Sequence, residues 1–341
     1  MLCQRRAVRL DDNLAVAMAH TKKYDHDDGD DAVAVSRSRS TQHPSNQTGR
    51  RRGQACGEFT RLHHVAPHGS RDYLLFAPAE SPRTRLPLII MLHGCHQDAD
   101  EFAFSTRMNA HAQKHRCYVA YPVQAVQANG AKCWNWYEAS HQQREQGEPG
   151  IIADLTQHLL ATYRIAGERV FIAGFSAGGA MAATLAVLYP ELYAALGIHS
   201  GVPHGAARDF LSAMIAMQHG TMASYGAHPR HGHIPTIVFH GDEDTMVHST
   251  HAAQFMARAG ASHYPPEQGE RYTESVARQS GRHGYTRTIQ MDGNRRIFSE
   301  RWMVHGGGHA WYGGNAKGTY MDPHGPDASG EMVRFFLERR R

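Results

Sequence analysis

The chain has 341 residues, 41% of them hydrophobic, which is enough for one large α/β domain or two smaller ones. Its longest apolar runs, such as LPLIIML, are far shorter than the roughly 18 residues of a spanning helix, so no membrane partner is expected. The net charge is +4, but residues 1–57 hold 10 Lys and Arg against 7 Asp, which leaves 26 basic and 25 acidic residues elsewhere. This balance argues against a nucleic-acid partner.

Residues 1–57 differ in composition from the rest of the chain. They mix polar and charged residues with few large apolar ones and show no lasting periodicity, so we expect a disordered polar tail. The short apolar run LAVAMA follows Asp11 and Asp12 and is too short for the core of a signal peptide. No export signal is therefore readable, and one folded domain is expected over residues 58–341.

Apolar, β-prone runs alternate with helix-like segments through this domain. RDYLLFAPA predicts a strand that ends at Pro78, and the strand-like runs LPLIIMLHG and CYVAYPV flank the helical DEFAFSTRMNAHAQKHR. Another strand, AALGIHSG, precedes a mixed insertion over residues 202–233, and a last helix is expected over Ala328–Arg341. This order predicts an α/β fold with a mainly parallel sheet, helices on both faces and a small mixed insertion.

The segment Val170–Pro190, VFIAGFSAGGAMAATLAVLYP, predicts a strand, a glycine-rich turn and a helix, with Ser176 at the bend. The Gly-x-Ser-x-Gly pattern alone is weak, because the chain holds 33 glycines, but the strand and helix around it give it context. A serine on such a turn presents its hydroxyl above the sheet, and Gly174 and Gly178 leave room for the bend. The N–H of Ala177 would then lie free at a helix N-terminus, where negative charge is favoured.

A serine nucleophile needs a histidine base and an acid that orients it, in the chain order serine, acid, histidine for hydrolases of this type. The strand in IPTIVFHGDEDTMV ends in a loop with Asp242 and Asp244. The strand in RWMVHGGGHAWYGG ends in a loop with His305 and His309. Each loop therefore offers two candidates for its role.

Residues from about Glu58 to the end resemble the polyhydroxybutyrate depolymerase family of esterases, a branch of the α/β-hydrolases that is also similar to feruloyl and acetylxylan esterases. The resemblance is carried, in chain order, by LHGCHQDADEFAFSTRMNAHA, VAYP, CWNW, GFSAGGAMAA, HSGVPHGAARD, HGDEDTMV and GGGHAWYGG. It implies an α/β-hydrolase catalytic domain over residues 58–341 that cleaves polyhydroxybutyrate, its oligomers or short-chain esters. The alternatives are a feruloyl or acetylxylan esterase and, in another class, a non-catalytic binding protein on a hydrolase scaffold.

The resemblance also implies roles and a location. It favours Asp244 over Asp242 as the acid, and His305 is then interpreted as a histidine packed at a strand end. An extracellular or periplasmic enzyme is implied, although without a readable signal peptide a cytoplasmic one stays open. The implied site consists of Ser176 as nucleophile, Asp244 as acid, His309 as general base, and the backbone N–H groups of Cys95 and Ala177 as the oxyanion hole.

Two groups of residues beside these motifs have two interpretations each. Cys95 and Cys133 are either bridged, which requires an oxidising compartment, or are two buried free thiols. Trp134, Trp136 and Trp311 either form an apolar wall that binds the acyl group or the polymer, or belong to the core.

Twenty-six histidines raise the question of a metal, but no acid or cysteine completes a ligand set in the densest cluster, HPRHGH, so we expect neither metal nor cofactor. We expect no further module after the last helix. We therefore expect activity on short-chain esters or soluble hydroxybutyrate oligomers rather than strong binding to crystalline polymer. The oligomeric state stays open. The densest histidine cluster, HPRHGH, contains His228, His231 and His233.

Overall fold

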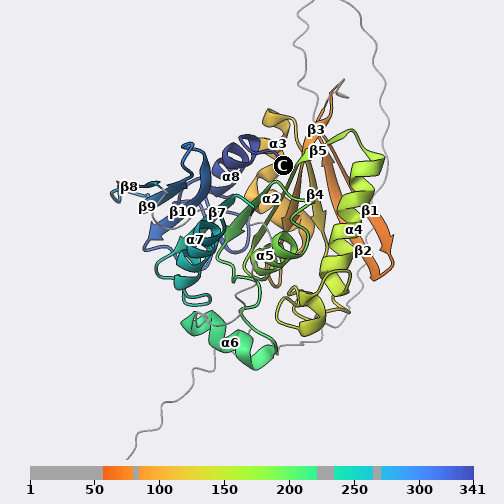
Figure 1. Cartoon of the computed structure of the whole chain (residues 1–341), viewed down its shortest axis with the longest axis horizontal. Helices are drawn as coiled ribbons and strands as arrows, with labels where there is room; N and C mark the ends of the chain where they lie inside the picture. The colour runs from red at the N-terminus through yellow and green to blue at the C-terminus, as the bar shows by residue number, and fades with distance from the viewer. Residues whose placement is uncertain (1–56, 80–83, 221–233, 264–269) are drawn as a thin grey trace, which may run out of the picture. The chain divides into compact units, whose positions relative to one another are not determined.

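The computed structural model of the protein describes residues 57–79, 84–220, 234–263 and 270–341 (Figure 1). Residues 1–56, which make up all but the last residue of the expected polar tail, lie outside the described residues. The histidine-rich HPRHGH segment lies outside them as well. The division of the chain at residue 57 stays a prediction.

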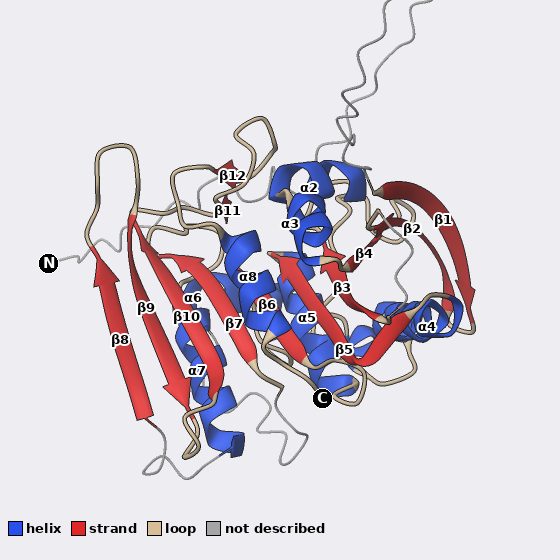
Figure 2. Ribbon diagram, turned by 90° about the horizontal axis from the view of Figure 1, so that it is seen from above, coloured by secondary structure: helices blue, strands red, loops and turns tan. Residues whose placement is uncertain are grey.

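A ten-stranded sheet in the order β1-β2-β4-β3-β5-β6-β7-β10-β9-β8 forms the centre of the fold (Figure 2). The six central strands, from β4 to β10, pair in parallel, whereas the strands at both edges pair antiparallel. The strands are β1 (Glu58–Ala66), β2 (Gly69–Ala77), β3 (Leu86–Leu92), β4 (Tyr118–Pro122), β5 (Ile165–Phe175), β6 (Ala195–His199), β7 (Thr236–Gly241), β8 (Glu270–Val276), β9 (Gly284–Met291) and β10 (Ile297–His305).

Alternate side chains of the buried central strands point to opposite faces of the sheet, and each face is covered by helices. In β3, Leu88 and Ile90 contact the layer that contains α4, α5, α6 and α7, whereas Ile89 and Met91 contact the layer that contains α2, α3 and α8. The helices are α2 (Ala99–Thr106), α3 (Met108–His115), α4 (Gly147–Thr162), α5 (Ala177–Leu188), α6 (Phe210–His219), α7 (Thr250–His263) and α8 (Ala328–Leu337), with a 3₁₀ turn η1 (Ala139–Gln142).

The mainly parallel sheet with helices on both faces is confirmed, and the described structure adds three features. The antiparallel edge strands β1, β8 and β9 were not predicted, because their exposed polar residues hide the apolar signal of a strand; all seven residues of β8 are exposed or half-buried. The last helix ends at Leu337, before the expected Arg341. Within the described part of the insertion, α6 is the helix, and a short parallel pair, β11 (Trp311–Tyr312) and β12 (Met321–Asp322), follows the sheet.

One buried carboxylate fastens the antiparallel edge to the helix layer. Glu300 of β10 has no exposed side-chain surface and accepts hydrogen bonds from the guanidinium of Arg287 on β9, at 3.1 Å to each oxygen. It also accepts two from Arg334 of α8, at 2.9 and 2.7 Å. A buried charge held by two cations is costly to leave half-paired.

We expect Glu300→Ala to lower the free energy of unfolding by about 3 kcal/mol, because two guanidinium groups lose their buried partner. The matched control is Glu331→Ala, which removes a half-exposed carboxylate 2.7 Å from the same Arg334 and is expected to cost less than about 1 kcal/mol. Chemical denaturation of both variants measures the difference. Equal losses would show that the buried pairing has no special weight.

Candidate active site

Ser176 lies between the last residue of β5 and the first residue of α5, at a bend that strains its backbone. Its φ is 54° and its ψ is −120°, a conformation rare for a residue with a side chain, and its N–H donates to the carbonyl of His199 at 2.9 Å. A Cβ on Gly174 would lie 2.2 Å from the carbonyl oxygen of Gly178, and one on Gly178 would lie 2.2 Å from that of Leu92. Both glycines are therefore required for the bend.

The structure brings the predicted serine, histidine and acid together from three different loops. The Ser176 hydroxyl lies 2.9 Å from Nε2 of His309, and Nδ1 of His309 lies 2.8 Å from a carboxylate oxygen of Asp244. The other oxygen of Asp244 accepts from the N–H groups of Met246 and Val247, at 2.9 and 2.8 Å. These bonds fix the carboxylate so that it orients the imidazole.

Asp244 keeps its charge although it is buried. Burial raises its pKa, but hydrogen bonds and charge interactions with His240 and His309 lower it more, so the pKa of Asp244 is held well below its ordinary value. A charged carboxylate holds a proton on Nδ1 of His309 and leaves Nε2 free to accept the proton of the Ser176 hydroxyl.

The weaker alternatives, Asp242 and His305, bond to each other and not to Ser176. Nδ1 of His305 lies 2.8 Å from Asp242, whose other oxygen accepts from the N–H of Gly306 at 2.7 Å. Nε2 of His305 lies 2.9 Å from the hydroxyl of Thr286. His305 ends β10, but its side chain is exposed, so the expectation that it is packed there was wrong. The exposed pair fastens the start of the loop that carries His309.

The two predicted oxyanion donors lie where two chain segments meet. Ala177 is the first residue of α5, so its N–H has no acceptor within the helix. Around Cys95, the N–H of Gly94 donates to Gln97 at 3.0 Å and that of His96 donates to Ala131 at 2.7 Å. Within the described residues, no hydrogen bond uses the N–H of Cys95 or of Ala177.

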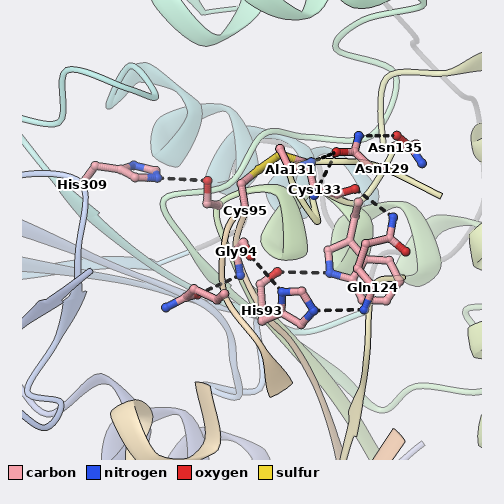
Figure 3. Close-up of a disulfide and its surroundings, with 12 residues drawn as sticks. His93, Gly94, Cys95, Gln124, Asn129, Ala131, Cys133, Asn135 and His309 are labelled. Carbon is pink, nitrogen blue, oxygen red and sulfur yellow. Dashed lines mark hydrogen bonds between the residues drawn. A yellow bond between two sulfur atoms is a disulfide. The ribbon is translucent and has the colours of Figure 1, made fainter. Parts of the chain in front are cut away.

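Cys95 and Cys133 form a disulfide, the first of the two interpretations of these cysteines (Figure 3). The bridge spans 38 positions and ties the loop after β3 to the CWNW segment. Cys117 is a buried free thiol whose pKa burial raises to about 12, so it is inert at neutral pH.

The three tryptophans lie in the core, which corrects their interpretation as a substrate-binding wall. Trp134 and Trp311 are completely buried and Trp136 is 6% exposed, so they offer almost no surface to a ligand. The indole N–H of Trp134 donates to the carbonyl of His93 at 3.1 Å, and that of Trp311 donates to Ser329 at 3.1 Å. Trp134 thus bonds to the loop after β3, and Trp311 bonds to α8.

Sequence reasoning missed three buried histidines that bond to residues of the site or lie beside them in the chain. His93 directly follows β3, His199 is the last residue of β6, His240 is the residue before the last of β7, and none of the three has exposed surface. Burial holds the pKa of His93 below and that of His199 well below the ordinary value, so both rings are neutral. The signal was a histidine at or near the carboxyl end of each apolar strand, because such positions converge at the carboxyl edge of the sheet.

The described residues contain no group of three or more histidine, cysteine or acidic side chains arranged to hold a metal ion. Among their helices, none is both long and apolar enough to cross a membrane.

Residues 71–261 match the family model described as esterase PHB depolymerase. The chain belongs to this family. It is 30% identical over 265 residues to poly(3-hydroxyalkanoate) depolymerase C of Paucimonas lemoignei. The aligned stretch covers 75% of this chain and 60% of the depolymerase. It is 28% identical over 180 residues to feruloyl esterase B of Thermothelomyces thermophilus. This aligned stretch covers 48% of this chain and 61% of the esterase. The chain thus spans less than two thirds of either relative.

Solved structures agree on the fold. The acetyl xylan esterase from Aspergillus awamori matches with a TM-score of 0.64 at 17% identity, over 82% of this chain and 99% of the esterase. An S-formylglutathione hydrolase from Agrobacterium tumefaciens matches with a TM-score of 0.51 at 13% identity, over 83% and 95% of the two chains. The α/β-hydrolase fold expected from the motifs is confirmed, as is the family.

The two aspartates of the β7 loop allow a matched test. We expect Asp244→Asn to lower kcat on an ester by a factor on the order of 10⁴, because the amide no longer holds the proton on Nδ1 of His309. Asp242→Asn should change kcat far less, since Asp242 bonds only to the loop before that histidine. Steady-state kinetics on p-nitrophenyl butyrate compares them, and a larger loss in Asp242→Asn would reverse the assignment.

Reduction of the Cys95–Cys133 disulfide should lower kcat, because the loop with one proposed oxyanion donor loses its covalent attachment. By the chain-entropy estimate the bridge also contributes about 4 kcal/mol to stability. Activity and melting temperature are measured with and without dithiothreitol, and thiol titration confirms complete reduction. Cys117→Ala is the control, and its response to the reductant should equal that of the wild type. Full activity of the completely reduced protein would contradict the expectation.

Proposed function

We propose that the protein is a serine carboxylesterase in which Ser176 is the nucleophile, His309 the general base and Asp244 the acid that orients it. The observation that carries the proposal is the unbroken series of hydrogen bonds from the Ser176 hydroxyl through both ring nitrogens of His309 to Asp244, at 2.9 and 2.8 Å. Such a series converts a weakly nucleophilic hydroxyl into one that loses its proton as it attacks.

The reaction then proceeds in two acyl-transfer steps. His309 takes the proton of Ser176, the serine oxygen attacks the ester carbonyl, and the tetrahedral oxyanion accepts hydrogen bonds from the N–H groups of Cys95 and Ala177. His309 returns the proton to the departing alcohol, which leaves an acyl-enzyme on Ser176. Water, deprotonated by the same His309, attacks the acyl-enzyme, and a second tetrahedral intermediate collapses to release the acid and restore the serine.

The proposed substrates are polyhydroxybutyrate, its oligomers and short-chain esters. The family match and the likeness to a poly(3-hydroxyalkanoate) depolymerase support this class. We further propose an extracellular or periplasmic location, because a disulfide beside the site persists in an oxidising compartment.

A substrate panel with wild type and Ser176→Ala tests the proposal. The panel contains p-nitrophenyl butyrate, a hydroxybutyrate trimer, methyl ferulate and acetylated xylan. We expect hydrolysis of the first two and, in the mutant, a loss of kcat by a factor on the order of 10⁶. A fluorophosphonate should label the wild type and leave Ser176→Ala unlabelled.

The other outcomes of the same panel are equally clear. Hydrolysis confined to methyl ferulate or acetylated xylan would replace the proposed substrate by a plant polysaccharide ester. Activity retained in Ser176→Ala would overturn the mechanism. Absence of both hydrolysis and labelling in the wild type would favour a non-catalytic binding protein.

A further inference from the structure

The peptide bond between Gly94 and Cys95 carries the proposed oxyanion donor on one side and a carbonyl on the other. Its carbonyl oxygen, that of Gly94, accepts a hydrogen bond from Nδ1 of His93 at 2.8 Å. Since the C=O and N–H of a trans peptide point in opposite directions, fixing the carbonyl also fixes the direction of the Cys95 N–H. The His93 side chain therefore determines where this donor points.

The bonding of His93 determines which of its nitrogens carries the proton. Nε2 of His93 lies 3.1 Å from the backbone N–H of Gln124, which is always a donor, so Nε2 accepts and carries no proton. The proton of the neutral ring is then on Nδ1, the nitrogen that faces the carbonyl of Gly94. The backbone N–H of Gln124 thus selects the His93 tautomer that can donate to the carbonyl of Gly94.

The Gln124 side chain is anchored in turn. Its amide nitrogen donates to the carbonyl of Cys133 at 2.8 Å and to a carboxylate oxygen of Glu148 through a short hydrogen bond. Gln124 and Glu148 are each 1% exposed, and Glu148 lies in the first turn of α4. The side-chain bonds to Cys133 and Glu148 thus hold Gln124, the residue whose backbone N–H bonds to His93.

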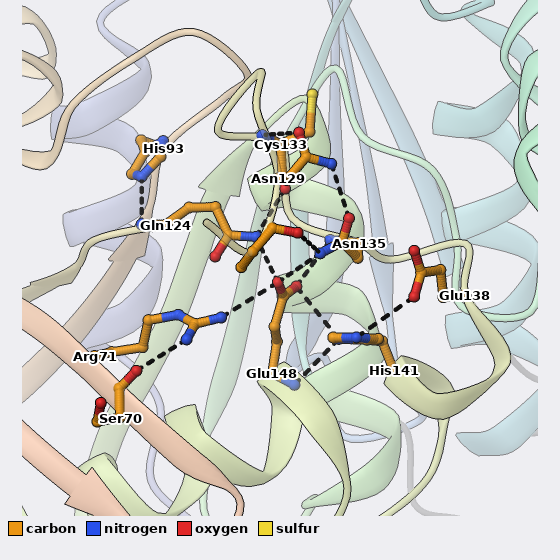
Figure 4. Close-up of polar contacts among 11 residues, drawn as sticks. Ser70, Arg71, His93, Gln124, Asn129, Cys133, Asn135, Glu138, His141 and Glu148 are labelled. Atoms are coloured by element: carbon orange, nitrogen blue, oxygen red, sulfur yellow. Dashed lines mark hydrogen bonds and ion pairs between the residues drawn. The ribbon is translucent and has the colours of Figure 1, made fainter. Parts of the chain in front are cut away.

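The Glu148 carboxylate bonds to residues of several chain segments (Figure 4). It accepts from the backbone and side-chain amides of Asn135, at 2.8 and 2.9 Å, and the N–H of Glu148 donates to Nδ1 of His141 at 3.1 Å. Arg71 of β2 forms an ion pair with it at 3.5 Å. Burial raises the pKa of Glu148, but His141, Gln124 and Asn135 lower it more, so the carboxylate stays charged.

We propose that His93, Gln124 and Glu148 are positioning residues that aim the Cys95 N–H at the reacting carbonyl, acting through the Gly94–Cys95 peptide. This inference rests on the proposed function, because the donor matters only if an oxyanion forms. His93 touches no reacting atom, and its effect passes through one peptide plane. The three residues form a polar relay, His93–Gln124–Glu148, on the opposite side of that peptide from the oxyanion.

The relay affects the transition state more than the ground state. A neutral ester carbonyl binds weakly to an oxyanion donor, whereas the charged oxygen of the tetrahedral intermediate binds strongly. Complete loss of one donor costs about 10² to 10³ in kcat, and a misaimed donor is expected to cost on the order of tenfold to a hundredfold. KM should change little, because only an interaction made in the transition state is weakened.

Two substitutions at His93 separate its two nitrogens. His93→Asn places an amide donor where Nδ1 lies and preserves the bond to Gly94, whereas His93→Gln places an amide where Nε2 lies and loses that bond. We expect His93→Gln to have a kcat on p-nitrophenyl butyrate about tenfold or more below that of His93→Asn. Each kcat is normalised to the concentration of active sites, titrated with a fluorophosphonate, so misfolded protein does not contribute to the measured value. Equal values per active site would overturn the inference.

Gln124→Met and Arg71→Met form a second matched pair, since each removes one partner of Glu148 and only Gln124 lies on the route to Cys95. Both should lower the melting temperature, but only Gln124→Met should lower kcat per active site and weaken a trifluoromethyl ketone inhibitor by the same factor. The inhibitor forms a hemiketal whose oxyanion uses the same donors. Equal kcat and inhibitor affinity in the two variants would show a purely structural role and overturn the inference.

Failure of this inference is distinguishable from failure of the proposed function. If the proposed function is wrong, the wild type shows no Ser176-dependent hydrolysis of any ester, which overturns both. If only this inference is wrong, the wild type hydrolyses esters through Ser176 while the paired variants match each other.

Discussion

The close approach of α5 to the end of β3 is the constraint on which the rest of the site depends. Gly178 lies so near the carbonyl of Leu92 that no larger residue fits, and this contact brings the start of α5 beside the loop that follows β3. The N–H groups of Ala177 and Cys95, the two proposed oxyanion donors, belong to these two segments. A side chain at position 178 would push α5 away from the end of β3 and separate the two proposed donors.

Buried carboxylates hold the segments around this contact. Asp244 joins the β7 loop to the His309 loop, and Glu148 joins α4 to the CWNW segment and to the strand end at Gln124. Glu300 fastens the antiparallel edge to α8 in the same manner. Each is buried and has several hydrogen-bond partners, which is the condition under which a buried carboxylate orders its neighbours instead of destabilising them.

The parts of the fold and site that could be predicted from the sequence depend on local signals. Ser176, Asp244 and His309 follow apolar strands within motifs, and the structure brings these three together. The edge strands β8 and β9 could not be predicted, because half-exposed strands lack a continuous apolar run.

The interpretation of the tryptophans and the role of Glu148 show a second limit. Whether an aromatic side chain such as Trp311 faces a ligand or the core depends on packing between distant segments, which no local pattern reveals. Glu148 looks like an ordinary acidic residue at a helix start, and only its donors from three other segments give it a further role.

Two of the bonds that hold the loop after β3 act on different degrees of freedom. The disulfide from Cys95 to Cys133 fixes where the loop lies, but a bond through the side chain leaves the Gly94–Cys95 peptide free to rotate. The hydrogen bond from His93 fixes that rotation and leaves the position to the disulfide. Because an oxyanion donor is effective only when it needs no reorganisation as charge develops, the proposed role of the Cys95 N–H calls for both restraints.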